Sequence, residues 1–360
     1  MAQVAAYKSA LRKMTETSPT CLWNDSASTE ELAYSIEHGA VGATCNPVIV
    51  LDVLKREMAQ WKDHISQLVR DMPTATEGQV GWRLVEDVSK RAAELLLPAF
   101  KKHQGKNGRL SVQTDPRFYR DTDALVAQAL HFSALAPNII VKLPATSAGI
   151  AAIEEAVYGG VCINATVSFS LPQALAVAEA VERGLTRRSR DSKPDIPLGS
   201  VCTIMVGRLD DWLKIVAEKE GLVLDPGALD FAGVAVFKKA YAIYRERGYR
   251  TRLLSAAFRN HYHWSELIGG DIVISPPHKW QVLFNNSDIE VTPRIDKPVD
   301  ANIIQQLSKL RDFQRAYEPD GLSVADFDSF APTVRTLRQF LAACHDLESL
   351  IRNFMLPDPS

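Results

Sequence analysis

Lys142 is the residue whose type and surroundings point most directly to chemistry. It follows the apolar, β-branched run Ile139-Ile140-Val141, and Pro144 comes two residues later. Such a run is typical of a strand buried on both faces, and burial disfavours the charged form of an amine. A buried lysine can therefore act as a neutral nucleophile near neutral pH, as a Schiff-base enzyme requires. A lone lysine at a strand end more often extends its charge into water, so the rest of the chain has to decide between the two interpretations.

The elements that must position Lys142 form a repeating pattern. Short apolar segments at 21–25, 41–45, 110–114, 161–167, 201–205, 252–256 and 272–275, with the segment around Lys142, predict eight strands. Helical patterns separate them, at 26–38, 48–70, 77–103, 122–135, 147–158, 171–183, 209–220, 229–247 and from 260, with a polar loop at 187–197. Eight strands alternating with helices favour a single (β/α)8 TIM barrel over an open doubly wound sheet.

Further helices are expected at both ends of the barrel. Residues 4–16 predict an opening helix, and residues 302–355 predict two amphipathic helices, joined by a turn at 319–323 and packed on the barrel exterior. No repeat, low-complexity segment or long linker calls for a second domain. Residues 1–360 are therefore expected to form one domain, with 300–360 as an appended helical tail.

Polar residues gather at the predicted carboxyl ends of the strands, where the active sites of such barrels lie. They are Asp25, Asn46, Gln113, Lys142, Asn164, Thr166, Thr203, Arg208, Arg259, Asn260 and Ser275. Each one alone has an explanation as a turn, cap or main-chain partner. Arg208 and Arg259, however, stand at predicted helix starts, where a cation opposes the helix dipole unless an anion such as phosphate lies between them. The set supplies the parts of a Schiff-base aldol enzyme that acts on a phosphorylated sugar.

Composition excludes several other classes of function. The chain has 360 residues, 46% of them hydrophobic, and a formal net charge of -2, with no dense basic cluster for nucleic acid. No apolar run has the length of a membrane span or a signal peptide, so no membrane association and a cytoplasmic location are expected. The five cysteines are odd in number and lack metal-ligand spacing, which favours small buried hydrophobes over ligands or disulfides.

Six segments together resemble the transaldolase family, whose superfamily also holds the fructose-6-phosphate aldolases. They are Trp23-Asn24-Asp25-Ser26, Gly42-Ala43-Thr44-Cys45-Asn46-Pro47, Ile140-Val141-Lys142-Leu143-Pro144-Ala145-Thr146, Asn164-Ala165-Thr166-Val167-Ser168-Phe169-Ser170, Val206-Gly207-Arg208 and Phe258-Arg259-Asn260. Each is weak evidence alone, but they occur in the family's order and cover about two thirds of the chain.

The resemblance implies a role for each matching residue. Lys142 would form the imine with a ketose carbonyl, and Asp25 would move the proton that opens or closes the carbon–carbon bond. The substrate hydroxyls or the catalytic water would be held by Asn46, Asn164 and Thr166, and the phosphate by Arg208 and Arg259. Phosphorylated ketoses and aldoses of carbohydrate metabolism, as in the pentose phosphate pathway, would be the substrates. The family uses no metal and no organic cofactor because the imine is the electron sink. Its members are often dimers, so a homodimer is one assembly to expect.

The chain departs from the family pattern around the pocket. Gln113 stands where transaldolases usually have glutamate and the aldolases have glutamine, and an amide can orient a water but cannot take its proton. Met205 replaces phenylalanine or tyrosine, Thr203 replaces a serine, and Ala257 replaces a serine beside the phosphate. Three hypotheses follow: transfer of a dihydroxyacetone unit, Schiff-base aldol cleavage with a free three-carbon ketone, and a phosphosugar-binding barrel without turnover.

Overall fold

The computed structural model describes residues 7–197 and 199–357. Eight parallel strands close into a barrel in chain order, which confirms the predicted (β/α)8 fold. The strands are β1 (Cys21–Asn24), β2 (Ala40–Cys45), β3 (Arg109–Gln113), β4 (Ile139–Pro144), β5 (Ile163–Thr166), β6 (Val201–Ile204), β7 (Arg252–Ala256) and β8 (Val273–Ser275). None of the helices in the described part of the chain has the length and apolar character needed to span a lipid bilayer.

Alternation along β4 decides which side chains enter the barrel. Val141 and Leu143 belong to the large apolar core that includes the surrounding helices. Ile140 belongs instead to a small separate cluster with residues of the other strands, Trp23, Cys162, Val201, Leu254, Ala256 and Val273. Because residues i and i+2 of a strand point to the same face, Lys142 points into the barrel directly above this cluster.

Helices surround the barrel. They are α1 (Ala10–Thr17), α2 (Thr29–Glu37), α3 (Pro47–Arg56), α4 (Met58–Asp71), α5 (Glu77–Lys102), α6 (Thr122–Ser133), α7 (Ser147–Tyr158), α8 (Leu171–Arg190), α9 (Val206–Lys219), α10 (Pro226–Leu229), α11 (Ala232–Arg247), α12 (Tyr262–Ser265), α13 (His278–Asn285), α14 (Ala301–Leu307), α15 (Arg311–Tyr317) and α16 (Ala331–Met355), with short 3-10 turns η1 (Pro116–Phe118) and η2 (Val324–Ser329).

Three of the predicted helix boundaries were wrong. The predicted helix 48–70 is two helices that meet at Glu57, whose backbone leaves the helical region (φ −108°, ψ 23°). The predicted helix 229–247 corresponds to α11, which begins at Ala232, whereas Leu229 ends the separate short helix α10. Helix α8 continues to Arg190 into the predicted loop 187–197, because Arg187 is paired with Glu154 and Glu155 of α7. The start of the predicted helix 4–16 lies outside the described residues, and α1 begins at Ala10.

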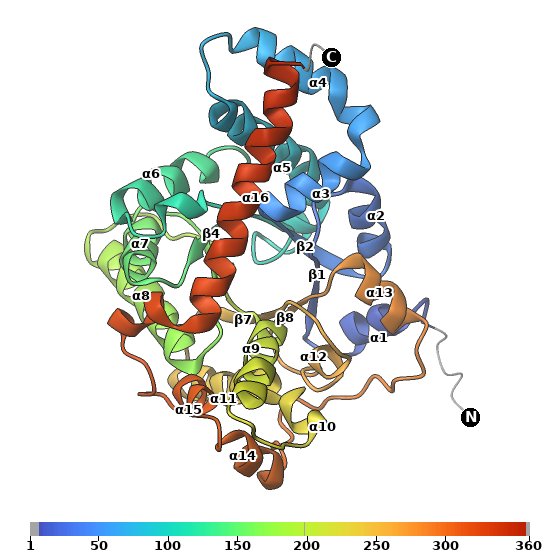
Figure 1. The fold of residues 1–360 in the computed structure, drawn as a ribbon, viewed down its shortest axis with the longest axis vertical. Helices are drawn as coiled ribbons and strands as arrows, with labels where there is room; N and C mark the ends of the chain where they lie inside the picture. The colour runs from blue at the N-terminus through green and yellow to red at the C-terminus, as the bar shows by residue number, and fades with distance from the viewer. Residues whose placement is uncertain (1–6, 198, 358–360) are drawn as a thin grey trace.

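The carboxyl-terminal tail differs most from its prediction. It holds α14, α15, η2 and α16 rather than two helices, and α16 does not lie on the outer wall. Figure 1 shows α16 crossing the end of the barrel from the region of α8 to that of α4. It contacts α3, α5 and α9, and it buries Leu337, Phe340, Leu347 and Ile351 beneath it. Helix α16 therefore covers part of the end of the barrel where the polar strand ends lie.

Candidate active site

Lys142 lies in the mouth of the barrel, with only 4% of its surface exposed. In the register of the sheet it stands beside Gln113 of β3 and Asn164 of β5. Burial lowers the pKa of Lys142 below its usual value, and this effect outweighs the opposing attraction of Asp25. The positive charge of Arg208 lowers the pKa further. These surroundings favour the neutral amine that attacks a carbonyl group.

Asp25 follows β1 at the same end of the barrel. The Thr44 hydroxyl of β2 donates a hydrogen bond of 2.6 Å to Asp25 Oδ1, which orients the carboxylate. A hollow of about 370 Å³, lined by Asp25 together with residues of α2, α3 and the segment 277–279, opens beside it. Asp25 is thus a carboxylate near the Lys142 amine that a molecule entering this hollow can reach.

Gln113 and Thr166 end β3 and β5, the two strands on either side of the Lys142 strand; Gln113 lies beside Lys142 and Thr166 beside Pro144. Among the residues that the structure describes, Gln113 Oε1 and Thr166 Oγ1 are buried and have no hydrogen-bond partner. Both side chains line a small cavity of about 10 Å³, which Leu337 and Phe340 of α16 cover. That volume is about the size of one water molecule, and the two oxygens supply polar contacts that a buried water needs.

Asn164 and Thr203 form a short hydrogen-bond chain inside the barrel. Asn164 Nδ2 donates to the Ser111 hydroxyl at 2.9 Å, and the Thr203 hydroxyl donates to Asn164 Oδ1 at 2.7 Å. The Asn164 amide is therefore fixed by its neighbours and retains one N–H for a ligand. Thr203 orients Asn164 through its hydroxyl, a function that a serine in its place could also perform.

Asn46 has a structural task at the edge of the site. Its Oδ1 accepts a hydrogen bond of 3.0 Å from the main-chain N–H of Ile49 and so caps α3, which begins at Pro47. The cap uses only the carbonyl oxygen. Among the described residues, the cap leaves the Nδ2 group without a hydrogen-bond partner.

Arg208 lies in the first turn of α9, as its sequence position predicts, and it is largely buried. Burial lowers the pKa of its guanidinium, and the nearby charge of Arg259 adds to the effect. Nη1 lies 3.4 Å from the Thr336 hydroxyl of α16, and within the described ranges the buried Nε has no partner. A buried cation with an unpartnered N–H group is suited to hold an anion.

Arg259 is held differently from Arg208. It does not start a helix, which corrects the sequence interpretation: it lies in the bend between β7 and α12, and α12 has only four residues. Its guanidinium forms a fork with Asp211 of α9, with Nε–Oδ2 at 2.9 Å and Nη2–Oδ2 at 2.7 Å. Nη1 also donates to the Phe258 carbonyl at 3.1 Å. The two arginines are neighbours, but Arg259 must share its guanidinium between Asp211 and any anion.

Asn260 and Ser275 complete the set of predicted strand-end residues. Asn260 Nδ2 donates to the Asp230 carbonyl at 3.2 Å, and its Oδ1 accepts from the Tyr262 N–H, so its polar groups serve the loop. Ser275 ends β8 and is fully buried, and its hydroxyl finds no partner in the described part of the chain. The position of Asn260 is therefore explained by local structure, while the Ser275 hydroxyl is a polar group in the barrel without a partner among the described residues.

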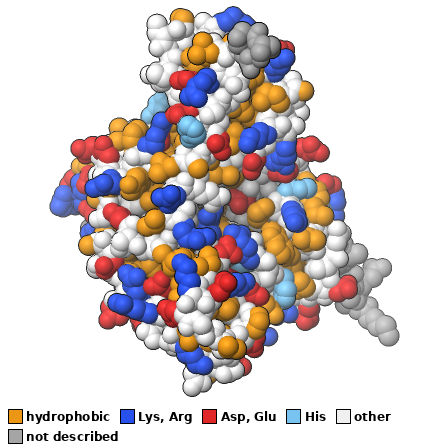
Figure 2. Space-filling model, viewed as in Figure 1, with side chains coloured by type: hydrophobic (Ala, Val, Ile, Leu, Met, Phe, Trp, Pro, Cys, Tyr) orange, Lys and Arg blue, Asp and Glu red, His pale blue; other side chains and the backbone are white. Residues whose placement is uncertain are grey.

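The face that contains this mouth is shown in Figure 2, in the same view as Figure 1. Lys and Arg side chains gather near its middle, below the course of α16. Asp and Glu side chains lie among them, so the face carries charges of both signs. Within 7–197 and 199–357, no group of three or more His, Cys, Asp or Glu side chains is placed to hold a metal ion.

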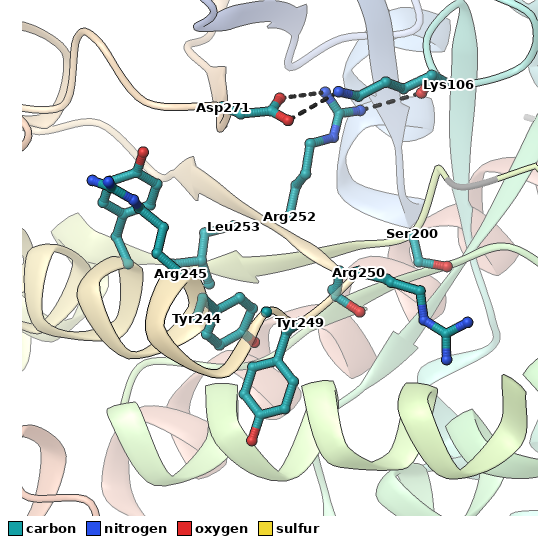
Figure 3. A pocket seen from close by; sticks show the side chains of 12 residues that line it. Lys106, Ser200, Tyr244, Arg245, Tyr249, Arg250, Arg252, Leu253 and Asp271 are labelled. Carbon is teal, nitrogen blue, oxygen red and sulfur yellow. Dashed lines mark hydrogen bonds and ion pairs between the residues drawn. The ribbon is translucent and has the colours of Figure 1, made fainter. Parts of the chain in front are cut away.

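A further hollow, of about 470 Å³, lies at the opposite, amino-terminal end of the strands. Figure 3 shows Lys106 and Arg252 directed at Asp271, while Arg245 and Arg250 point away to either side. Arg245 pairs with Asp296, and Arg250 with Glu182. Because carboxylates of the chain already neutralise these cations, and active sites of such barrels lie at the other end, this hollow is not the candidate site.

Comparison with known proteins assigns the family. The family described as Transaldolase/Fructose-6-phosphate aldolase matches residues 22–330. The chain belongs to this family. A Transaldolase of Kocuria rhizophila is 30% identical over 208 residues, 57% of this chain and 56% of the relative. A Transaldolase of Mycobacterium leprae is 30% identical over 222 residues, which are 60% of this chain and 58% of the relative. A Transaldolase 2 of Streptomyces avermitilis is 31% identical over 207 residues, which are 57% of this chain and 55% of the relative. The aligned part of the chain thus spans little more than half the length of these curated relatives.

The departures from the transaldolase pattern surround the candidate site. Gln113 lies beside Lys142, and Met205 is the residue that precedes α9 and is nearly buried. Ala257 has a left-handed backbone (φ 64°), and its carbonyl group approaches Gly207 so closely that a Cβ there would lie 2.0 Å from the oxygen. Gly207 is therefore required by the close approach of the two segments that carry the arginines.

Sequence reasoning missed several residues that hold this transaldolase-family site together. They are Thr44, Asp211, the α16 residues Thr336, Leu337 and Phe340, and the buried pair Asp210 and His263. Thr44 carries a signal, since it is a polar residue near the end of a buried strand. The α16 residues carry none, because an amphipathic pattern does not say which surface the helix covers.

Proposed function

We propose that this protein transfers a dihydroxyacetone unit from a ketose phosphate to an aldose phosphate through a Schiff base on Lys142. The observation that carries the proposal is the burial of the Lys142 amine in the barrel mouth, with its pKa lowered and the Asp25 carboxylate within electrostatic reach. The names of the relatives support transfer as the reaction.

In the proposed reaction, the Lys142 nitrogen attacks the ketose carbonyl, and uptake of one proton with loss of water gives the protonated imine. Asp25 then accepts the proton of the hydroxyl group beside the bond to be broken. The carbon–carbon bond breaks, its electron pair moves into the imine to form an enamine, and the aldose leaves. Attack of the enamine on an acceptor aldehyde, with return of the proton from Asp25, reverses these steps. Water then releases the new ketose and the free lysine.

The remaining residues of the site have supporting roles in this proposal. Gln113 and Thr166 would orient the water that forms and hydrolyses the imine, since both residues line one small cavity and each has a side-chain oxygen without a partner among the described residues. Asn46 and Asn164 would donate to substrate hydroxyls. Arg208 and Arg259 would bind the phosphate, Arg208 partly through its Nε–H group, which has no partner among the described residues.

A second function is favoured by one residue. Gln113 can hold a water but cannot accept a proton from it, which removes the second acid/base group that a glutamate would supply. The alternative is an aldolase that releases or accepts a free three-carbon ketone.

Product analysis with and without an acceptor tests the proposal and separates it from the alternative. A ketose phosphate incubated with the enzyme alone should give little free three-carbon ketone, and an added aldose phosphate should restore full turnover. Free ketone formed at full rate without any acceptor would reject obligatory transfer and establish the aldolase.

A further inference from the structure

A buried histidine–aspartate pair lies behind the two arginines. His263 Nε2 and Asp210 Oδ2 are 2.7 Å apart, and both side chains are completely buried. The other carboxylate oxygen of Asp210 accepts a hydrogen bond of 2.7 Å from the Gly233 N–H. Asp210 belongs to α9, two residues after Arg208, while His263 follows Arg259 by four residues. The pair therefore joins the helix that carries one arginine to the loop that carries the other.

The hydrogen bonds fix the protonation of the histidine ring. The main-chain N–H of Arg259 donates to His263 Nδ1 at 3.1 Å. A main-chain N–H can only donate, so Nδ1 must be the unprotonated acceptor, and the hydrogen of the neutral ring lies on Nε2, directed at Asp210. Asn260 Nδ2, 3.4 Å from Nε2, is a weaker contact whose amide also donates to the Asp230 carbonyl. Asp210 thus selects the tautomer that can hold Arg259.

The Arg259 segment depends on this support because its backbone is unusual. Ala257 has a left-handed backbone, and Arg259 follows after a single residue. A β-carbon on Gly207 would lie 2.7 Å from Arg259 Cγ and 3.1 Å from His263 Cε1, so the two segments are packed against each other. A shift of the Arg259 main chain would move its guanidinium relative to Arg208 and change the spacing of the phosphate-binding groups.

We propose that His263, oriented by Asp210, is a positioning residue for the phosphate subsite: it holds the main chain of Arg259 at the distance from Arg208 that a phosphate group requires. The inference rests on the proposed function only in assigning the phosphate to these arginines. It does not require that Lys142 form an imine.

Two substitutions at one position separate this role from general packing. In His263→Asn the amide oxygen can occupy the place of Nδ1 and accept from the Arg259 N–H, but it loses Asp210. In His263→Gln the amide nitrogen can reach Asp210, but the acceptor for Arg259 is lost. We expect H263Q to weaken binding of inorganic phosphate and raise the KM for a ketose phosphate about tenfold, and H263N to change both by about threefold or less.

Asp210→Asn provides a second variant at the other end of the pair. Both oxygens of Asp210 accept hydrogen bonds from N–H groups. In the variant, the NH2 group of the asparagine must therefore face one of these N–H donors, and that hydrogen bond is lost. D210N should weaken phosphate binding as H263Q does. The matched control is His64→Gln, which alters a histidine–aspartate pair between α4 and α5, with His64 Nε2 and Asp87 Oδ2 at 3.0 Å, and should leave both values unchanged.

The measurements are inorganic phosphate binding by calorimetry, the KM and kcat for the ketose phosphate, and the thermal unfolding of each variant. Larger loss of phosphate binding in H263Q than in H263N, with similar melting temperatures, supports the inference. Equal loss in the two variants overturns it, because the ring would then matter only for packing. Absence of phosphate binding in the wild-type protein overturns the subsite and the inference together. If the wild-type protein forms no imine that borohydride can trap, while the variants still differ in phosphate binding as expected, only the proposed function is rejected.

Discussion

At the scale of single residues, the site depends on how a few polar side chains are held. Asp25 is oriented by the Thr44 hydroxyl at 2.6 Å, and Asn164 by Ser111 and Thr203. These contacts hold a carboxylate and an amide near the Lys142 amine. In the proposed reaction, the carboxylate takes up a proton and the amide donates to a substrate hydroxyl. Loss of one such contact should therefore change the rate of the reaction more than the stability of the barrel.

Thr44→Val tests this for Asp25. Valine keeps the shape of threonine but removes the hydrogen bond to the carboxylate, and a hydrogen bond to a charged group contributes roughly 1.5–3 kcal/mol. We expect kcat to fall about 10- to 100-fold, with a small change in KM, measured with a saturating ketose phosphate and acceptor. Thr44→Ser, which retains the hydroxyl, is the control, and an equal loss of kcat in both variants would contradict the assignment.

Lys142→Met should separate activity from stability. Burial lowers the pKa of Lys142 in the folded state from 10.5, so the unfolded chain binds this proton more tightly than the folded one. The cost of burying the amine is fully present below the folded pKa and disappears as the pH rises past 10.5. The variant should lose turnover by a factor on the order of 10⁴ or more. It should also have a larger free energy of unfolding than wild type at neutral pH.

Urea unfolding of both proteins across the pH range measures that difference. The advantage of Lys142→Met should shrink as the pH rises toward 10.5. An advantage that stays constant or grows with pH would show that burial of the charge is not what the substitution relieves.

Much of the site could be predicted at this scale, and the reason is geometric. Parallel strands end at one edge of a barrel, so Asp25, Gln113, Lys142 and Thr166 had to meet once the strands were recognised. Contacts that depend on how a helix packs against a loop could not be predicted. The pairing of Asp210 with His263 depends on how α9 packs against the loop after β7, and the Asp211 fork depends on the same packing.

At the scale of elements, the strand predictions succeeded because each strand is a short apolar run between polar segments. The helix boundaries were less predictable. No proline or glycine marks the break between α3 and α4 at Glu57, and the extension of α8 to Arg190 depends on ion pairs with another helix. Local sequence does not contain that information.

Asn46 caps α3, and in the proposed function it also donates to a substrate hydroxyl. Two substitutions separate these two roles. Asn46→Ala removes the cap and should lower the free energy of unfolding by about 1 kcal/mol. Asn46→Ser keeps an oxygen that can accept from Ile49 and should be close to wild type in stability. Both remove the Nδ2 donor, so both should raise the KM for the ketose phosphate. Urea unfolding and steady-state kinetics check the two effects, and a normal KM in Asn46→Ser would show that Asn46 is only a cap.

At the scale of the whole molecule, the important feature is the path of α16. The tail was expected on the barrel exterior, but α16 crosses the mouth and covers the cavity lined by Gln113 and Thr166 (Figure 1). An amphipathic pattern predicts that a helix has a buried face but does not say which surface it covers. The helix therefore contributes walls to a site whose other residues come from the strand ends.

Phe340→Ala tests how strongly α16 is attached. Phe340 is 2% exposed and contacts the barrel mouth, so its removal should lower the free energy of unfolding by about 3–5 kcal/mol. Val334→Ala, at a position of the same helix that is 39% exposed, should change stability by about 0.5 kcal/mol or less. Urea unfolding of the two variants measures the difference, and equal values would mean that α16 packs only loosely over the mouth.

The central claim, that the buried amine of Lys142 forms an imine with a ketose, is tested most directly by borohydride trapping. The wild-type protein and Lys142→Met are each mixed with a ketose phosphate, reduced with borohydride, digested and analysed by mass spectrometry. We expect one reduced three-carbon unit on the peptide that contains Lys142, and no such adduct in the variant. An unmodified wild-type protein, or an adduct that persists in Lys142→Met, would contradict it.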